Sequence, residues 1–181
     1  MLAIGIMSGT SLDGVDACLV DIKKGKNSKF NIVHFTYVPY EKELKQRILN
    51  VSSNKPCNIQ TICSLNVEIS KAYVKAVKKL LKDSKVKSSE IEFIAMHGQT
   101  VWHNPDGRDN YESSTLQLGD PSVLAAAFDV KVISNFRTMD MACGGSGAPL
   151  VTFADYVLYS YIKECIALQY FGGISNVTYL K

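Results

Sequence analysis

The sequence predicts a mixed α/β fold, in which helices cover the faces of a β-sheet. Three short apolar segments at the start of the chain are separated by turn signals, a pattern typical of antiparallel strands. Farther along, strand patterns alternate with helical ones, as they do in sheets that contain parallel strands. The composition, 46% hydrophobic and 20% charged, is that of a globular protein and excludes a disordered, collagen-like or coiled-coil chain.

The first elements form an antiparallel meander. We expect its three strands over residues 3–7, 16–22 and 30–39. Asp13-Gly14 is a hairpin signal, because glycine accepts a positive φ, and residues 23–29 form a polar turn. Two helices follow, one over residues 41–51 and a longer one that Asn58 caps, with apolar residues at helical spacing as far as Leu80. Lysines on the other face of the longer helix indicate a solvated surface rather than a nucleic-acid site, because no aromatic residues lie among them.

The second half of the chain alternates strands and helices. A buried strand over residues 92–96 ends at a polar segment, and residues 104–114 form a surface loop. Asp120 caps a helix that Pro121 begins and that runs to about residue 128. The remaining elements are a helix from about 149 to 162 and strands over residues 116–118, 131–134, 165–171 and 174–180.

Charge and cysteine content narrow the class of protein. The net charge of +3 demands neither nucleic acid nor a membrane surface as a partner. No segment is apolar for long enough to cross a bilayer, and no basic region followed by an apolar one opens the chain. The five cysteines are odd in number and none are paired as C-x-x-C, which favours a reducing cytoplasm. The spacings around His97 and His103 match no common zinc pattern.

The first hairpin is the most informative motif. Its residues Gly9, Thr10, Ser11, Leu12, Asp13, Gly14, Val15 and Asp16 combine glycines, hydroxyls and two carboxylates. Glycines let backbone N–H groups approach an anion, and a carboxylate near phosphates can hold Mg²⁺, usually through water. The turn therefore suits a metal–nucleotide better than a lone anion. The alternative is an ordinary hairpin whose polar residues face water.

Two further segments follow predicted strands, where the residues of open α/β sheets often carry chemistry. After residues 131–134, Arg137 could hold a carboxylate or phosphate as a fork and Asp140 could act as a general base, or the two could form a surface pair. At the end of strand 92–96, His97 could bind a sugar hydroxyl or be a structural histidine. A serine hydrolase using Ser146 and His97 is a weaker third idea, because the nucleophile motif is imperfect.

Six segments together resemble the anhydro-N-acetylmuramic acid kinase family, within the actin, Hsp70 and sugar-kinase superfamily. They occur in the family's order along the chain. They are residues 5–16 (GIMSGTSLDGVD), 97–101 (HGQTV), 116–120 (LQLGD), 136–142 (FRTMDMA), 144–150 (GGSGAPL) and 172–176 (GGISN).

The resemblance implies a ribonuclease-H-like α/β lobe and an ATP-dependent kinase of cell-wall recycling. Such kinases open the internal bridge of 1,6-anhydro-N-acetylmuramic acid with water and phosphorylate O6, which gives N-acetylmuramic acid 6-phosphate. The stretch from Gly9 to Asp16 is expected to bind ATP, with Mg²⁺ at Asp13 or Asp16. Asp140 is expected to activate the water. Arg137, His97, Gln99 and Thr100 are expected to bind the sugar.

The resemblance also sets expectations for organisation. Family members are considerably longer, so residues 1–163 are expected to form the N-terminal lobe and residues 164–181 the start of a second. Tyr170-Phe171 stand where the family usually has Asn-Ile. A truncated, non-catalytic nucleotide- or sugar-binding fragment is therefore the alternative function. The expected partners are the sugar and ATP, with no nucleic acid or membrane, and a homodimer is left open.

Overall fold

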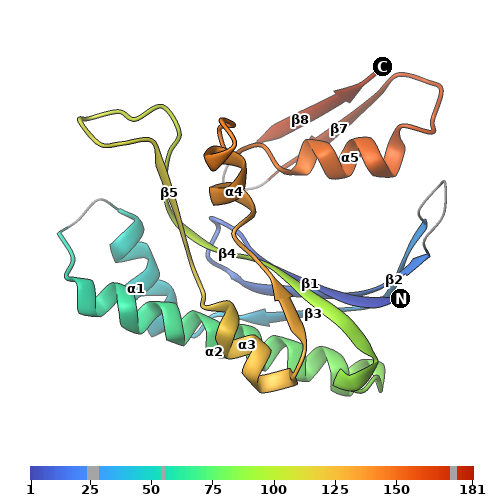
Figure 1. Ribbon diagram of the computed structural model, residues 1–181, viewed down its shortest axis with the longest axis horizontal. Coiled ribbons are helices and arrows are strands. Elements are labelled where there is room, and N and C mark those ends of the chain that lie inside the picture. Colours follow the sequence, from blue (N-terminus) through green and yellow to red (C-terminus); the bar gives the residue numbers. More distant parts are fainter. Residues whose placement is uncertain (24–28, 54–55, 172–174) are drawn as a thin grey trace. The chain divides into compact units, whose positions relative to one another are not determined.

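The computed structural model describes residues 1–23, 29–53, 56–171 and 175–181 (Figure 1). The chain divides into two compact units. The first comprises Met1–His103 with Leu116–Asn135, and the second comprises Asn104–Thr115 with Phe136–Lys181. The predicted lobe boundary after residue 163 stays a prediction.

The first unit is built on a mixed sheet in the order β3-β2-β1-β4-β5, with β6 also paired to β4. Its opening meander consists of β1 (Leu2–Ser8), β2 (Gly14–Lys23) and β3 (Lys29–Pro39), as predicted, although most of the predicted 23–29 turn lies outside the described residues. β4 (Ile91–Asn104) runs parallel to β1, and β6 (Lys131–Ile133) runs parallel to β4. β5 spans Ser114–Leu118. This mixed sheet, with helices packed on it, confirms the predicted α/β fold.

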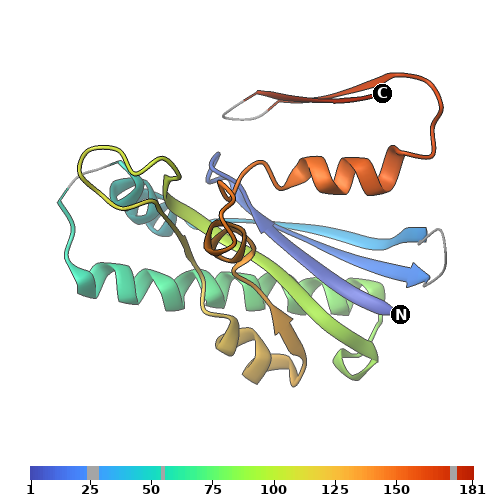
Figure 2. The ribbon, with the colours of Figure 1, turned by 45° about the horizontal axis from the view of Figure 1, so that its top comes forward.

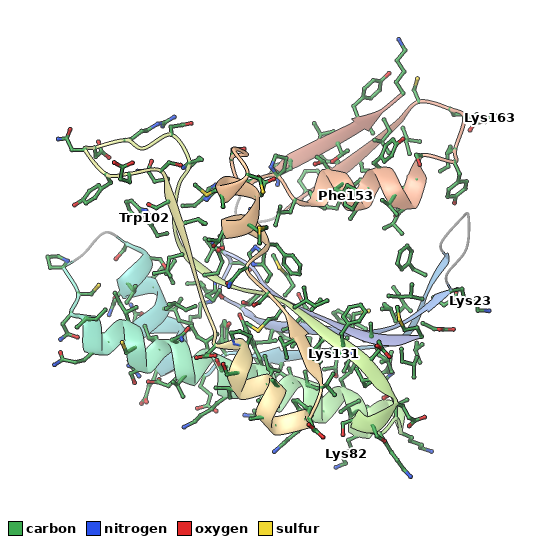
Figure 3. All side chains as sticks on the ribbon, viewed as in Figure 1. Lys23, Lys82, Trp102, Lys131, Phe153 and Lys163 are labelled. Atoms are coloured by element: carbon green, nitrogen blue, oxygen red, sulfur yellow. The ribbon has the colours of Figure 1, made fainter. Side chains whose placement is uncertain are left out.

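Three helices pack on one face of this sheet: α1 (Lys42–Ser52), α2 (Ile59–Ser84) and α3 (Pro121–Phe128) (Figure 2). Their apolar stripes and the inward side chains of the strands form a single buried cluster. Its largest fully buried members are Ile4, Leu19, Ile48, Leu65, Ile69, Tyr73, Leu80, Ile94, Met96 and Leu124. The lysines of α2 lie on its solvent side, as predicted, and Figure 3 shows Lys82 pointing away from the sheet.

The predicted caps of these helices are confirmed. The Asn58 side chain accepts a hydrogen bond from the Thr61 N–H at 2.8 Å, which satisfies one of the first free donors of α2. Asp120 does the same for the Ser122 N–H at 2.8 Å, with Pro121 in the first turn of α3.

The second unit contains α4 (Phe136–Ala142), α5 (Val151–Tyr159) and an antiparallel pair of strands, β7 (Ile166–Tyr170) and β8 (Asn176–Leu180). The Tyr170 hydroxyl donates to Oδ1 of the buried Asp155 of α5 at 2.5 Å, which raises the pKa of Tyr170 to about 12. The family-like glycines 172–173 lie outside the described residues. None of the helices within the described ranges is both long and apolar enough to cross a membrane.

One predicted strand end is wrong, and one helix is absent from the predicted elements. The strand expected over residues 92–96 continues to Asn104, because its polar second half pairs with β5. Polar residues can stay in a sheet when tertiary partners satisfy their side chains, and the sequence does not show such partners. No element is predicted over the residues of α4, because its seven residues carry no apolar stripe, and none of them is buried.

Candidate functional site

The turn between β1 and β2 separates its residues into an inner and an outer set. Leu12 is buried in the core at a positive φ of 52°, and its N–H donates to the Gly9 carbonyl at 3.2 Å. Thr10, Ser11 and Asp13 are exposed around this anchor. The turn is therefore held by one apolar side chain while its polar side chains face solvent.

The far end of the turn is tied to β3. The Asp13 carbonyl accepts hydrogen bonds from the Tyr40 N–H at 3.1 Å and from the Tyr37 hydroxyl at 2.8 Å. Gly14 follows at the start of β2, where a Cβ would lie 2.4 Å from the Val38 carbonyl oxygen. The reason predicted for this glycine is therefore wrong: it has no positive φ, and the close approach of β3 requires it instead.

The outer side of the turn can accept an anion. The backbone N–H groups of Thr10 and Ser11 donate to no acceptor within the described part of the chain. Successive free N–H groups of a turn can bind anionic oxygens, and the Thr10 hydroxyl adds a further donor. Among the predicted nucleotide residues, Val15 is fully buried and supports the turn from the core, whereas Asp16 is exposed.

The two carboxylates beside the turn differ in their electrostatics. Oδ1 of Asp13 accepts hydrogen bonds from the Ser11 hydroxyl at 2.8 Å and the Gly14 N–H at 3.1 Å, and the bond from Ser11 lowers the pKa of Asp13. Burial, and then the negative charge of Asp13, raise the pKa of Asp16. A cation between them would relieve this repulsion. Because no group of three or more metal-binding side chains occurs in the described ranges, phosphates and water would supply most ligands, as Mg²⁺ accepts.

The predicted sugar residues of β4 point to different sides of the strand. The register against β1 shifts between Ile6–Met96 and Ser8–Gln99, at Gly98 with its φ of 82°. This bulge turns Gln99 inward, where it is completely buried. His97 and Thr100 are half-buried on the other side. We therefore assign Gln99 to the support of the turn, since its Nε2 donates to the Gly9 carbonyl at 3.1 Å.

His97 and Thr100 are already engaged by the protein. Nδ1 of His97 lies 2.7 Å from the Gly98 carbonyl oxygen, which can only accept, so that nitrogen carries the proton. The Thr100 hydroxyl accepts from the Gln117 amide of β5 at 3.4 Å. Their expected part in sugar binding stays a prediction.

Arg137 and Asp140 lie together on α4 in the second unit, beside the loop at residues 143–150. Oδ2 of Asp140 accepts a hydrogen bond from the Gly147 N–H at 2.7 Å, and Nη1 of Arg137 donates to the Gly147 carbonyl at 2.6 Å. Burial lowers the pKa of the Arg137 guanidinium. The alternative of a direct Arg137–Asp140 surface pair is not what the described contacts show, because both side chains bind the same loop glycine.

The loop at residues 143–150 approaches Asp140 so closely that a side chain at position 145 would displace the Asp140 carboxylate. A Cβ on Gly145 would lie 2.2 Å from Oδ2 of Asp140. The Gly145 N–H also donates to the Asp140 carbonyl at 2.9 Å. The hydroxyl of Ser146 donates to the Ala148 carbonyl at 2.8 Å, so its proton is engaged by the backbone, contrary to what a serine nucleophile requires.

A family model described as anhydro-N-acetylmuramic acid kinase matches residues 1–181, the whole of this chain. The chain belongs to the anhydro-N-acetylmuramic acid kinase family. Curated relatives with that name include a Bacillus cereus protein that is 47% identical over 179 residues. Proteins of a second Bacillus cereus strain and of Bacillus thuringiensis subsp. konkukian are each 45% identical.

Each of these alignments covers 98% of this chain but 47% of the relative, so the chain spans about half the length of the curated kinases that it matches. The Thermus thermophilus RuvC structure aligns with 91% of this chain and 82% of that chain at 15% identity and a TM-score of 0.38. Likeness at that level supports no conclusion about this kinase-family chain.

The sequence analysis of this kinase-family chain missed the buried residues that support the turn between β1 and β2 from the core side. Ser8, Tyr40 and Tyr73 are almost completely buried, and the sequence analysis assigns none of them a part in the site. A signal was available, because a tyrosine on the buried stripe of a helix needs a partner for its hydroxyl.

Proposed function

We propose that this chain carries the ATP-binding and bridge-opening residues of a cytoplasmic anhydro-N-acetylmuramic acid kinase. Such a kinase adds water across the 1,6-anhydro bond of the sugar and transfers the γ-phosphoryl group of ATP to O6. The observation that carries the proposal is the family match over all 181 residues, together with a turn whose N–H groups and hydroxyls face outward.

The turn is suited to the triphosphate of ATP. The N–H groups of Thr10 and Ser11 would bind phosphate oxygens, and glycine at position 9 keeps a Cβ atom away from them. Mg²⁺ held through Asp13 or Asp16 would supply charge neutralisation for the phosphates. These two carboxylates fit that ion, because Asp13 is held in its charged form by Ser11 and Gly14.

Asp140 is suited to the role of general base. One carboxylate oxygen is fixed by the Gly147 N–H, and Oδ1 accepts no hydrogen bond from the described residues. Oδ1 would take a proton from water as the water oxygen forms a bond with the anomeric carbon. The bond from that carbon to O6 breaks, and O6 forms a bond to the γ-phosphorus while ADP leaves. One carboxylate can suffice, because phosphoryl transfer takes the place of protonation at O6.

Arg137 is suited to two tasks, to help position Asp140 and to bind an anion. Its Nη1 holds the Gly147 carbonyl, and Asp140 holds the N–H of the same glycine, so the two side chains fix one loop residue from both sides. A guanidinium there would also bind the carboxylate of the sugar or stabilise the negative charge that develops during phosphoryl transfer.

One observation favours a second function, nucleotide or sugar binding without turnover. The chain spans 47% of the curated kinases that it matches. In that case the 181 residues bind ATP or the sugar but give no product.

Product formation and binding separate these functions. The 181-residue chain is incubated with ATP, Mg²⁺ and 1,6-anhydro-N-acetylmuramic acid in H₂¹⁸O, and N-acetylmuramic acid 6-phosphate is measured by mass spectrometry. The same chain joined to the remaining residues of the Bacillus cereus relative is the matched comparison. Labelled product from both supports the kinase proposal, and product only from the joined chain supports binding without turnover. Both functions would be refuted if neither protein gave product and neither bound the nucleotide or the sugar in titration calorimetry.

A further inference from the structure

A buried polar network lies directly beneath the Gly9 turn. Ser8, Gln99 and Tyr73 are 0 to 1% exposed, and Tyr40 is 8% exposed. The Ser8 and Tyr73 hydroxyl oxygens are 2.6 Å apart, and the Tyr40 hydroxyl donates to Oε1 of Gln99 at 3.2 Å. Burying four polar side chains here is costly unless they bond to one another, so their arrangement is tightly fixed.

Gln99 connects this network to the turn. Its Oε1 is held by Tyr40, which fixes the amide so that Nε2 points at the Gly9 carbonyl, 3.1 Å away. The bulge at Gly98 brings Gln99 to this place. Met96 faces inward, and in a regular strand the next inward residue would be residue 98, with Gln99 facing outward. The shift in register makes Gln99 the next inward residue.

The orientation of the Gly9 carbonyl decides which way the next N–H points. In a trans peptide the C=O and the N–H of the following residue point in opposite directions. A Gly9 carbonyl held inward by Gln99 therefore directs the Thr10 N–H outward, on the side of the exposed Thr10 and Ser11 side chains. Glycine at position 9 would let this peptide rotate easily. The Leu12 N–H holds its carbonyl from within the turn at 3.2 Å, and Gln99 adds a second donor from the buried network below.

We propose that Gln99, fixed by Tyr40, is a positioning residue that orients the Gly9–Thr10 peptide for phosphate binding. This positioning role rests on the proposed function, because the ligand is taken to be the triphosphate of ATP. Gln99 itself touches no ligand, in contrast to the sugar-binding role that the sequence predicts for it.

The test compares Gln99→Met with Ser70→Ala. Methionine keeps the length of the side chain but removes the hydrogen bonds of the amide to the Tyr40 hydroxyl, the Gly9 carbonyl and the Thr100 carbonyl. Ser70 is a matched control, because it is fully buried and bonded on both sides, to the Asn66 carbonyl and the Asp120 N–H, away from the turn. Tyr40→Phe is a milder variant that removes only the hydroxyl that fixes Gln99, and it serves if Gln99→Met does not fold.

The first measurement is ATP affinity by titration calorimetry. Gln99→Met is expected to weaken ATP binding about tenfold or more, and Tyr40→Phe by less, while Ser70→Ala leaves it unchanged at a similar loss of thermal stability. Unchanged ATP affinity in Gln99→Met would overturn the proposal. So would loss of affinity for the anhydro-sugar alone, because Gln99 would then be a sugar ligand.

The second measurement needs no nucleotide and keeps the two proposals separate. The amide ¹⁵N and ¹H shifts of Thr10 and Ser11 in the wild-type chain are compared with those of the variants. Large changes confined to Gln99→Met and Tyr40→Phe support positioning even if the wild-type chain binds no ATP, a result that would refute only the proposed function. Thr10 shifts that stay at wild-type values in Gln99→Met would overturn the positioning role.

Discussion

Gly145→Ala tests the proposed base without changing the base itself. The added Cβ would lie 2.2 Å from Oδ2, 2.6 Å from Cγ and 2.7 Å from Oδ1 of Asp140. An ordinary carbon–oxygen contact is about 3.3 Å, so the carboxylate must move by roughly 1 Å. Asp140 is an exposed side chain and can swing away at little cost in folding energy, but it then loses its hydrogen bond to the Gly147 N–H.

The expected effect follows from that displacement. A misplacement of about 1 Å costs about 100-fold in the rate of a reaction that depends on orientation. In the chain joined to the remaining residues of the Bacillus cereus relative, Gly145→Ala should therefore lower kcat about 100-fold and leave the KM for ATP unchanged. In the 181-residue chain, the amide resonance of Gly147 should move.

Two comparisons make this result specific. Gly5→Ala is the control, because a Cβ on Gly5 meets no atom within 4 Å and its φ is not positive. Asp140→Asn should abolish bridge opening with ATP affinity retained, and adding Gly145→Ala to it should cost nothing more, since the displaced base is already gone. The reasoning is refuted if Gly145→Ala leaves both kcat and the Gly147 amide at wild-type values.

Three further changes test the turn. Gly9→Val should weaken ATP binding about tenfold or more with little change in folding stability, because its Cβ would lie 3.5 Å from the Ser11 hydroxyl in otherwise open space; unchanged affinity would remove the turn from the site. Gly14→Ala should cost about 1–3 kcal/mol in chemical denaturation, since its Cβ collides with the backbone of β3, and a cost no larger than that of Gly5→Ala would contradict this. Without divalent cations, Asp16→Asn should raise the thermal unfolding midpoint at pH 7 by less than about 2 °C. A carboxyl whose folded-state pKa is raised costs stability above that pKa, so this gain should vanish as the pH falls through it, and an equal gain at pH 3 would count against the shift.

The elements that the sequence predicts well are those with local signals. Period-2 and period-3.6 patterns locate the opening meander and α2, and the caps at Asn58 and Asp120 act where they are expected. The length of β4 has no local signal. Its second half is polar, and Gln99 stays in the sheet only because Tyr40 and the Gly9 carbonyl, distant in sequence, satisfy its amide.

The glycines show at single positions that contacts between distant elements cannot be predicted from a local motif. Glycine in a turn motif suggests backbone freedom, and that explanation holds for Gly98 with its positive φ. Gly14 and Gly145 are required for a different reason, the approach of the β3 backbone in one case and of the Asp140 carboxylate in the other. Neither neighbour can be read from the motif, because contact between the elements arises only on folding.

A family motif therefore mixes two kinds of residue that only burial can separate. In the stretch from Gly9 to Asp16, Leu12 and Val15 lie in the core, whereas Thr10, Ser11 and the two aspartates lie outside it. Resemblance alone assigns the whole stretch to ATP. The structure gives the outward residues the chemistry of a ligand site and the inward ones the task of holding its shape. Gln99 belongs to a different motif, but it is also buried. We therefore propose that it supports the site and does not bind a ligand.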